Sequence, residues 1–182
     1  MPVTGYGLAQ RDGLAVQVLE YCKRHGVKIA AAESLTGGLL ADAFVRIPGA
    51  SEVFLGSAVT YDIRAKAKIL GVDASLLARE GAVHPEVARQ MAAATARLYD
   101  QPEYGGRVIG LSTTGVAGPG PDGDKPAGLV YIGCSLPAVL TGGERTESAV
   151  ELHLHGDRGQ VREQTVWHVL NNVRQLTVGL QE

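Results

Sequence analysis

Residues 30–38 read AAAESLTGG, a run that sets a carboxylate and a hydroxyl directly before a pair of glycines. The apolar run 27–32 predicts a buried strand, and the pattern over 39–45 predicts a helix, so Glu33 and Ser34 fall in the turn between them. Glycine-rich turns of this kind expose backbone N–H groups that can hold a phosphate, a carboxylate or a developing oxyanion. Ser34 therefore has two possible roles, as the N-cap of the helix or as a nucleophile.

Strands and helices alternate on both sides of this turn. Apolar runs predict further strands at 54–61, 108–111, 129–136 and 148–154. One helix is predicted to end at Gly26 and another to cover 63–70. A short helix is predicted after Asp73, a longer one with Pro85 in its first turn, and a last one that starts near Asp157. This order predicts the α/β class: a three-layer α/β/α sandwich with a mixed sheet, parallel early and antiparallel late.

Composition limits the classes of function. The 182 residues, 45% hydrophobic, fit a short tail over 1–10 and one domain over 11–182. A net charge of −2 without a long basic run argues against a nucleic-acid binder and favours small-molecule or protein partners. Cys22 and Cys134 have no metal-ligand spacing and are expected to be core thiols. With no signal-like start and no membrane-length apolar run, we expect a cytoplasmic protein.

The candidate site gathers at the carboxyl ends of the parallel strands, where α/β sheets bind their ligands. Ser34, Tyr61 and the segment 112–128 should converge there. That segment is dense in Gly, Pro and Asp and is predicted to be a long loop, which favours a functional role as a substrate wall or lid.

Two lysines follow Tyr61. Lys66 and Lys68 lie two residues apart on a predicted helix, so only one of them can face the strand ends. A partly buried lysine near a helix N-terminus has a lowered pKa and could activate a serine. The alternative is that both lysines are solvated surface charges and that Tyr61 is an ordinary core aromatic residue.

Three other patterns suggest less specific chemistry. The segment GPGPDG at 118–123 matches a dinucleotide fingerprint only formally, because a strand and not a helix follows it. His153 and His155 share a strand face but have no third ligand at a suitable spacing, so a surface role is favoured over metal binding. Arg158 and Arg162, one helical turn apart, form either a fork for phosphate or a pair of solvated charges.

Five ordered blocks together resemble one family. They are ESLTGG at 33–38, VTYDIRAKAKILGV at 59–72, GAVHPEVARQMA at 81–92, TTGVAGPGPDGDKPAGLVYIG at 113–133 and HGDRGQVREQTV at 155–166. Over about residues 14–176 the chain resembles the CinA C-terminal domain family, whose stand-alone members include nicotinamide mononucleotide (NMN) amidohydrolases. The resemblance implies conversion of NMN to nicotinate mononucleotide and ammonia, without metal or cofactor, by a homodimer.

The resemblance also implies catalytic roles. Ser34 would be the nucleophile, Lys66 the base that takes its proton, and Tyr61 a residue that positions or relays that proton. The backbone at Thr36 and Gly37 is our expected oxyanion hole, since peptide N–H groups need no side-chain ordering.

Binding roles follow in the same way. Glu33 would orient the turn, Thr114 and Gly115 would belong to the substrate-contacting loop, and Arg158 would lie near the substrate phosphate. The chain departs from the family at Leu35, where Cys is frequent, and at His84, where a capping Ser is common.

Other functions remain open. The pyrophosphatase activity linked to a separate N-terminal domain of full-length CinA proteins is not carried over. The alternative reading is a catalytically weak module that binds a nucleotide or a partner, associated with competence or DNA damage. A third reading is an amidase for a different small amide.

Overall fold

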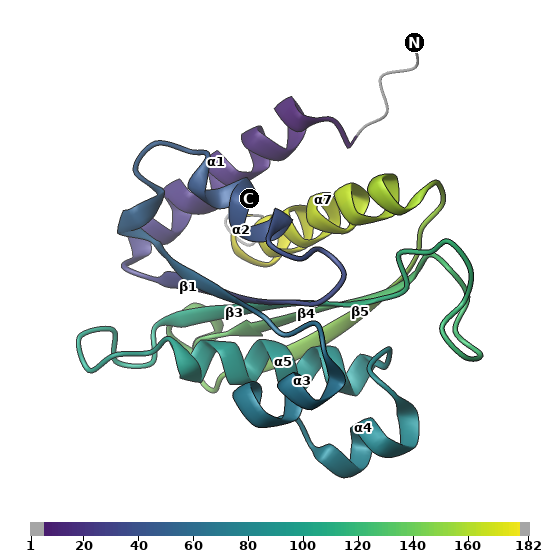
Figure 1. Ribbon diagram of the computed structural model, residues 1–182. Helices are drawn as coiled ribbons and strands as arrows, with labels where there is room; N and C mark the ends of the chain where they lie inside the picture. Colours follow the sequence, from purple (N-terminus) through teal and green to yellow (C-terminus); the bar gives the residue numbers. More distant parts are fainter. Residues whose placement is uncertain (1–5, 179–182) are drawn as a thin grey trace.

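The computed structural model describes residues 6–178 and has three layers (Figure 1). The central sheet contains β1 (Lys28–Glu33), β2 (Phe54–Val59), β3 (Val108–Gly115), β4 (Leu129–Leu136) and β5 (Thr146–His153) in the order β2-β1-β3-β4-β5. β1 pairs in parallel with β2 and β3, whereas β4 pairs antiparallel with β3 and β5. The predicted α/β/α sandwich with a mixed sheet is confirmed.

Helices cover both faces of this sheet (Figure 1). One face carries α1 (Leu8–His25), α2 (Leu39–Val45) and α7 (Arg158–Thr177), and the other carries α3 (Ile63–Leu70), α4 (Ala74–Glu80) and α5 (Pro85–Leu98). Two short helices, η1 (Ala50–Glu52) and α6 (Ala138–Thr141), lie in connections. None of the helices within residues 6–178 is long and apolar enough to cross a membrane.

α5 packs unusually close to the sheet because glycines replace side chains at the contact. A Cβ on Gly110 of β3 would lie 1.9 Å from the Ala92 carbonyl oxygen, and one on Gly133 of β4 would lie 2.4 Å from that of Ala88. Both approaches are far inside van der Waals contact, so the position of α5 depends on these glycines.

Several predicted boundaries were right because local capping determines them. The Asp62 side chain accepts a hydrogen bond from the Arg64 N–H. In the same way, the Asp73 side chain accepts hydrogen bonds from the N–H groups of Ser75 and Leu76, and the Asp157 side chain accepts one from the N–H of Gln160. Each aspartate satisfies N–H groups that the helix itself leaves unpaired. The starts of α3, α4 and α7 therefore follow from the sequence.

Other boundaries were wrong. α1 begins at Leu8, so residues 8–10 of the predicted tail are helical, while residues 1–5 lie outside the described part. β2 ends at Val59, which puts Tyr61 in the following loop and not at the strand end. The predicted turn at 141–143 overlaps α6, whose last residue is Thr141, and β5 spans 146–153 where 148–154 was predicted.

The largest error concerns β3. It continues to Gly115, so the first four residues of the predicted loop 112–128 are strand. Ser112, Thr113 and Thr114 are polar, which suggested a loop, but all three are fully buried and bonded. Ser112 Oγ, for example, donates to the Ala88 carbonyl at 2.6 Å. Satisfied hydroxyls and the β propensity of Thr allow these residues in a buried strand.

Candidate active site

The Glu33 carboxylate organises the turn after β1. Its side chain is fully buried. It accepts hydrogen bonds from the N–H groups of Gly38, Leu40 and Ala41 and from the hydroxyls of Thr36 and Ser57, all between 2.7 and 3.0 Å. A carboxylate at this place compensates the positive end of α2. Glu33 therefore orients the turn, and the capping role for Ser34 is wrong, because Gly38 is the N-cap residue.

Ser34 is bonded to a buried lysine. Lys66 Nζ lies 3.0 Å from Ser34 Oγ and also donates to the carbonyls of Thr60 at 2.6 Å and Tyr61 at 3.3 Å. Lys66 is fully buried, whereas Lys68 is exposed, as expected for positions two apart on a helix.

Burial also changes the acidity of Lys66. It lowers the pKa of Lys66 from 10.5 to about 8, and the nearby Asp62 charge opposes this lowering. A fraction of the Lys66 side chains is therefore neutral near pH 7 and able to accept the Ser34 proton.

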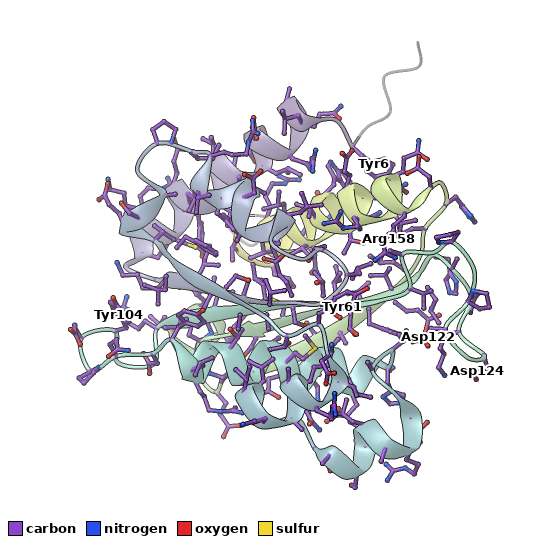
Figure 2. All side chains as sticks on the ribbon, viewed as in Figure 1. Tyr6, Tyr61, Tyr104, Asp122, Asp124 and Arg158 are labelled. Atoms are coloured by element: carbon purple, nitrogen blue, oxygen red, sulfur yellow. The ribbon has the colours of Figure 1, made fainter. Side chains whose placement is uncertain are left out.

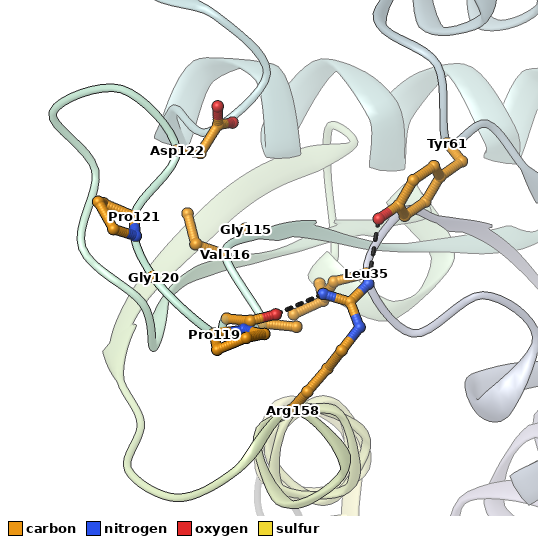
Figure 3. A pocket seen from close by; sticks show the side chains of 11 residues that line it. Leu35, Tyr61, Gly115, Val116, Pro119, Gly120, Pro121, Asp122 and Arg158 are labelled. Carbon is orange, nitrogen blue, oxygen red and sulfur yellow. Dashed lines mark hydrogen bonds between the residues drawn. The ribbon is translucent and has the colours of Figure 1, made fainter.

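A cavity of about 230 Å³ reaches Leu35, the residue that follows Ser34 (Figure 3). It is lined by Leu35, Tyr61, Arg158, the last β3 residue Gly115, and the loop residues Val116, Ala117, Gly118, Pro119, Gly120, Pro121 and Asp122. Four segments that are distant in the sequence thus form its walls. The part of the predicted loop that follows β3 supplies most of the lining.

Tyr61 and Arg158 meet at this cavity (Figures 2 and 3). Arg158 Nη2 donates to the Tyr61 hydroxyl at 3.1 Å, and Nη1 donates to the Gly118 carbonyl at 2.6 Å. Tyr61 is 62% exposed, so it is not a core aromatic residue. Its carbonyl, and not its hydroxyl, is the group bonded to Lys66.

The end of β3 forms the back of the site. Thr113 accepts the Ser34 N–H through its carbonyl at 3.0 Å and its hydroxyl at 3.3 Å. The Thr114 hydroxyl donates to the Ala82 carbonyl at 2.7 Å. Gly115 has φ +153°, and a Cβ there would lie 2.6 Å from the Leu129 carbonyl oxygen, so the strand end requires glycine.

Sequence reasoning missed the role of Arg162. Its guanidinium donates from Nε to the Leu35 carbonyl and from Nη2 to the Thr36 carbonyl, both at 2.9 Å. Arg158 and Arg162 therefore point to different partners and form no common fork. The spacing of one helical turn from Arg158 signalled a shared helix face but not the carbonyl partners.

The remaining predicted features lie outside this site. His153 Nε2 is bonded to Glu151 at 2.7 Å, and within residues 6–178 no group of three or more His, Cys, Asp or Glu side chains could hold a metal. Cys22 and Cys134 are buried free thiols whose pKa values burial raises to about 12, which confirms them as core residues. His84 caps α5 by accepting the Glu86 N–H at 3.2 Å.

Comparison with known proteins supports the relationship that the motifs suggest. The chain is 43% identical over 176 residues to a CinA-like protein of Frankia casuarinae and 40% identical over 165 residues to a CinA-like protein of Myxococcus xanthus, covering 96% and 90% of this chain. It spans only 37% and 36% of those two relatives.

Solved structures agree with these similarities. The competence/damage inducible protein CihA from Agrobacterium tumefaciens is 30% identical, with a TM-score of 0.79 over 91% of this chain and 94% of that one. The competence damage-inducible protein A (ComA) from Klebsiella pneumoniae is 25% identical, with a TM-score of 0.80 over 91% and 95%. The CinA C-terminal domain profile matches residues 11–177, and the chain belongs to that family.

Proposed function

We propose that this protein is an amidohydrolase that converts NMN to nicotinate mononucleotide and ammonia, using Ser34 as nucleophile and Lys66 as base. The observation that carries the proposal is the 3.0 Å contact between Lys66 Nζ and Ser34 Oγ, with the pKa of Lys66 lowered to about 8. A buried lysine in this state can remove the serine proton at neutral pH.

The chemistry proceeds in two halves. Neutral Lys66 takes the Ser34 proton while Oγ attacks the carboxamide carbon, and the C=O electron pair moves onto the oxygen. Collapse of this intermediate breaks the C–N bond, and protonated Lys66 gives its proton to the leaving nitrogen, which departs as ammonia. Water then attacks the ester carbon with Lys66 again as base, which releases the carboxylic acid and restores Ser34.

The cavity lined by Leu35, the residue after Ser34, supports a nucleotide substrate. Arg158 stands at its edge with its guanidinium exposed and close to Tyr61, so it can pair with a phosphate while the reacting amide reaches Ser34. In this proposal Tyr61 positions the substrate or relays a proton, Gly115 forms part of the substrate-side wall, and Glu33 holds the turn. Thr114 does not line the cavity, because it is fully buried and its hydroxyl donates to the Ala82 carbonyl.

Ammonia release from NMN in the presence of a chelator tests the proposal. We expect turnover by the wild type, a loss of about 10³-fold or more in Ser34→Ala and in Lys66→Ala, and near-normal turnover in Lys68→Ala. A folded wild type without turnover would contradict the proposal and favour the nucleotide- or partner-binding alternative. Preferential turnover of nicotinamide would instead favour a different small amide as substrate.

We also propose a homodimer, because Val59, Tyr61, Ile63 and Ile69 expose large apolar side chains within one short segment. Sedimentation velocity tests this, and a monomer at micromolar concentration would contradict it. The cytoplasmic location and the lack of nucleic-acid binding stay predictions of the sequence.

A further inference from the structure

Most backbone N–H groups of the turn after Ser34 donate a hydrogen bond to another protein atom. N–H groups with a protein acceptor are those of Ser34, Gly37, Gly38, Leu39, Leu40 and Ala41. Over this stretch of the described chain, only the Leu35 and Thr36 N–H groups donate to no protein atom. Since buried N–H groups are nearly always paired, these two donors need an explanation.

These hydrogen bonds exclude the first turn of α2 as the anion-binding element. The Glu33 carboxylate already occupies the N–H groups of Gly38, Leu40 and Ala41. The N–H of Gly37, which we expected in the oxyanion hole, donates to the Ser34 carbonyl at 3.1 Å. An oxyanion at Ser34 must therefore find its backbone donor elsewhere.

Leu35 meets the requirements better than Thr36. Thr36 is completely buried, whereas Leu35 is 3% exposed and lines the cavity. The Leu35 N–H also belongs to the residue directly after the nucleophile. A donor so close to Oγ is suited to an oxygen that becomes negative as Oγ bonds to the carbonyl carbon.

Arg162 is linked to this donor through two peptide units. Its Nη2 donates to the Thr36 carbonyl, and the same peptide unit carries the Gly37 N–H. That N–H donates to the Ser34 carbonyl, whose peptide unit carries the Leu35 N–H. Hydrogen bonds in series polarise one another, so the guanidinium charge strengthens the final donor.

The same guanidinium also fixes the other side of Leu35. Arg162 Nε donates to the Leu35 carbonyl at 2.9 Å. The turn between these contacts requires Gly37, whose φ is +53°. Both peptide units that flank Leu35 are thus held, one directly and one through Gly37.

We propose that the Leu35 N–H is the oxyanion donor of this site and that Arg162 is the positioning residue that orients and polarises it. This inference rests on the proposed amide hydrolysis. The Leu35 N–H stabilises the tetrahedral oxyanion, and Arg162 acts only through the backbone, without touching the substrate.

The first test separates turnover from binding. We expect Arg162→Gln to lower kcat for NMN by about 10- to 100-fold, somewhat less than removal of an oxyanion donor itself. KM and the midpoint of the pH profile should stay near the wild-type values, because Lys66 is untouched. Arg162→Lys should recover part of the loss. The matched control is Arg24→Gln, which removes another arginine bonded to a backbone carbonyl, on α1.

The second test does not depend on the substrate. A fluorophosphonate labels an activated serine and places an oxygen in the same oxyanion site. We expect labelling of Ser34 to slow in Arg162→Gln and in a protein carrying the α-hydroxy acid analogue of leucine at position 35, which replaces that N–H by oxygen. The analogue keeps the side chain, so it remains informative even where Arg162→Gln is unstable.

The outcomes distinguish the two proposals. Labelling of the wild type without NMN turnover would reject the proposed substrate and leave the oxyanion donor to be judged by the labelling rates. Unchanged labelling of the position 35 analogue would overturn the donor assignment. Unchanged labelling of a folded Arg162→Gln protein would overturn the role of Arg162.

Discussion

The amine nitrogen of Lys66 lies 3.0 Å from the hydroxyl oxygen of Ser34, although the two residues are 32 positions apart. Parallel pairing of β1 with β2 produces this contact, because both strands end at the same edge of the sheet. The Thr60 N–H donates to the Glu33 carbonyl at 3.0 Å, so the two chain segments are still joined where Ser34 begins. α3 then begins at Ile63, and Lys66 in its first turn contacts Ser34.

The activity should follow the ionisation of Lys66. Only the neutral amine accepts a proton, so kcat/KM is expected to rise with pH and to level off above about 8, the pKa that burial gives this lysine. Asp62→Asn should move the midpoint to lower pH, because the Asp62 charge raises the pKa of Lys66. A pH–rate profile of both proteins measures this, and a profile that is flat from pH 6 to 9 would contradict the role of Lys66.

The same ionisation affects stability. Below pH 8, folding buries a charged lysine, which costs free energy. Between pH 8 and pH 10.5 the folded state has released this proton while the unfolded state still binds it, so the stability of the fold rises with pH and the cost is gone above 10.5. The lowering of the Lys66 pKa from 10.5 to about 8 corresponds to about 3 kcal/mol in the free energy of unfolding. Wild type should therefore gain stability relative to Lys66→Met over this pH range. Urea unfolding at pH 7 and pH 10 checks it, and a constant difference would argue against a buried charge.

Glu33→Gln should destabilise the fold strongly. The five donors that converge on this carboxylate would face an amide with one acceptor oxygen and an NH₂ group that also donates. We expect a loss of about 2–4 kcal/mol. Thermal unfolding gives the value. Glu52→Gln, which breaks an exposed pair with Lys23, is the control and should change stability by less than about 1 kcal/mol.

Arg158→Gln should discriminate substrates by their phosphate. We expect KM for NMN to rise about tenfold or more, as for a lost charge-assisted bond, while kcat/KM for the corresponding nucleoside without phosphate stays unchanged. Steady-state kinetics with both substrates decides the matter. Equal losses for the two would mean that Arg158 shapes the loop through the Gly118 carbonyl and does not bind phosphate.

Gly110→Ala should displace α5. The added Cβ would lie 1.9 Å from the Ala92 carbonyl oxygen, so helix and sheet must separate. We expect a loss of about 3 kcal/mol or more, at the upper end of the overpacking range. Gly143→Ala is the control, because its Cβ would have no atom within 4 Å. Equal melting temperatures for the two variants would show that the contact relaxes easily.

Local signals made much of this fold predictable. The starts of α3, α4 and α7 follow from aspartates that cap them, and the strand–turn–helix unit at 27–45 follows from its apolar periodicity and its glycines. The five family blocks likewise pointed to Ser34, Tyr61, Lys66 and Arg158 before any contact was known. Predictions failed where buried polar residues have distant partners, as for Ser112 and Thr114 in β3.

The sequence by itself therefore determined the class of fold, the family and the candidate residues, because periodicity, capping and motifs are properties of neighbouring residues. Only the tertiary structure decided what those residues contact. It set Glu33 on the N–H groups of α2, buried Lys66 against Ser34, separated Arg158 from Arg162 and left the Leu35 N–H without a protein acceptor. Burial, pKa and hydrogen-bond partners all depend on segments that meet only when the sheet and its two helical layers assemble.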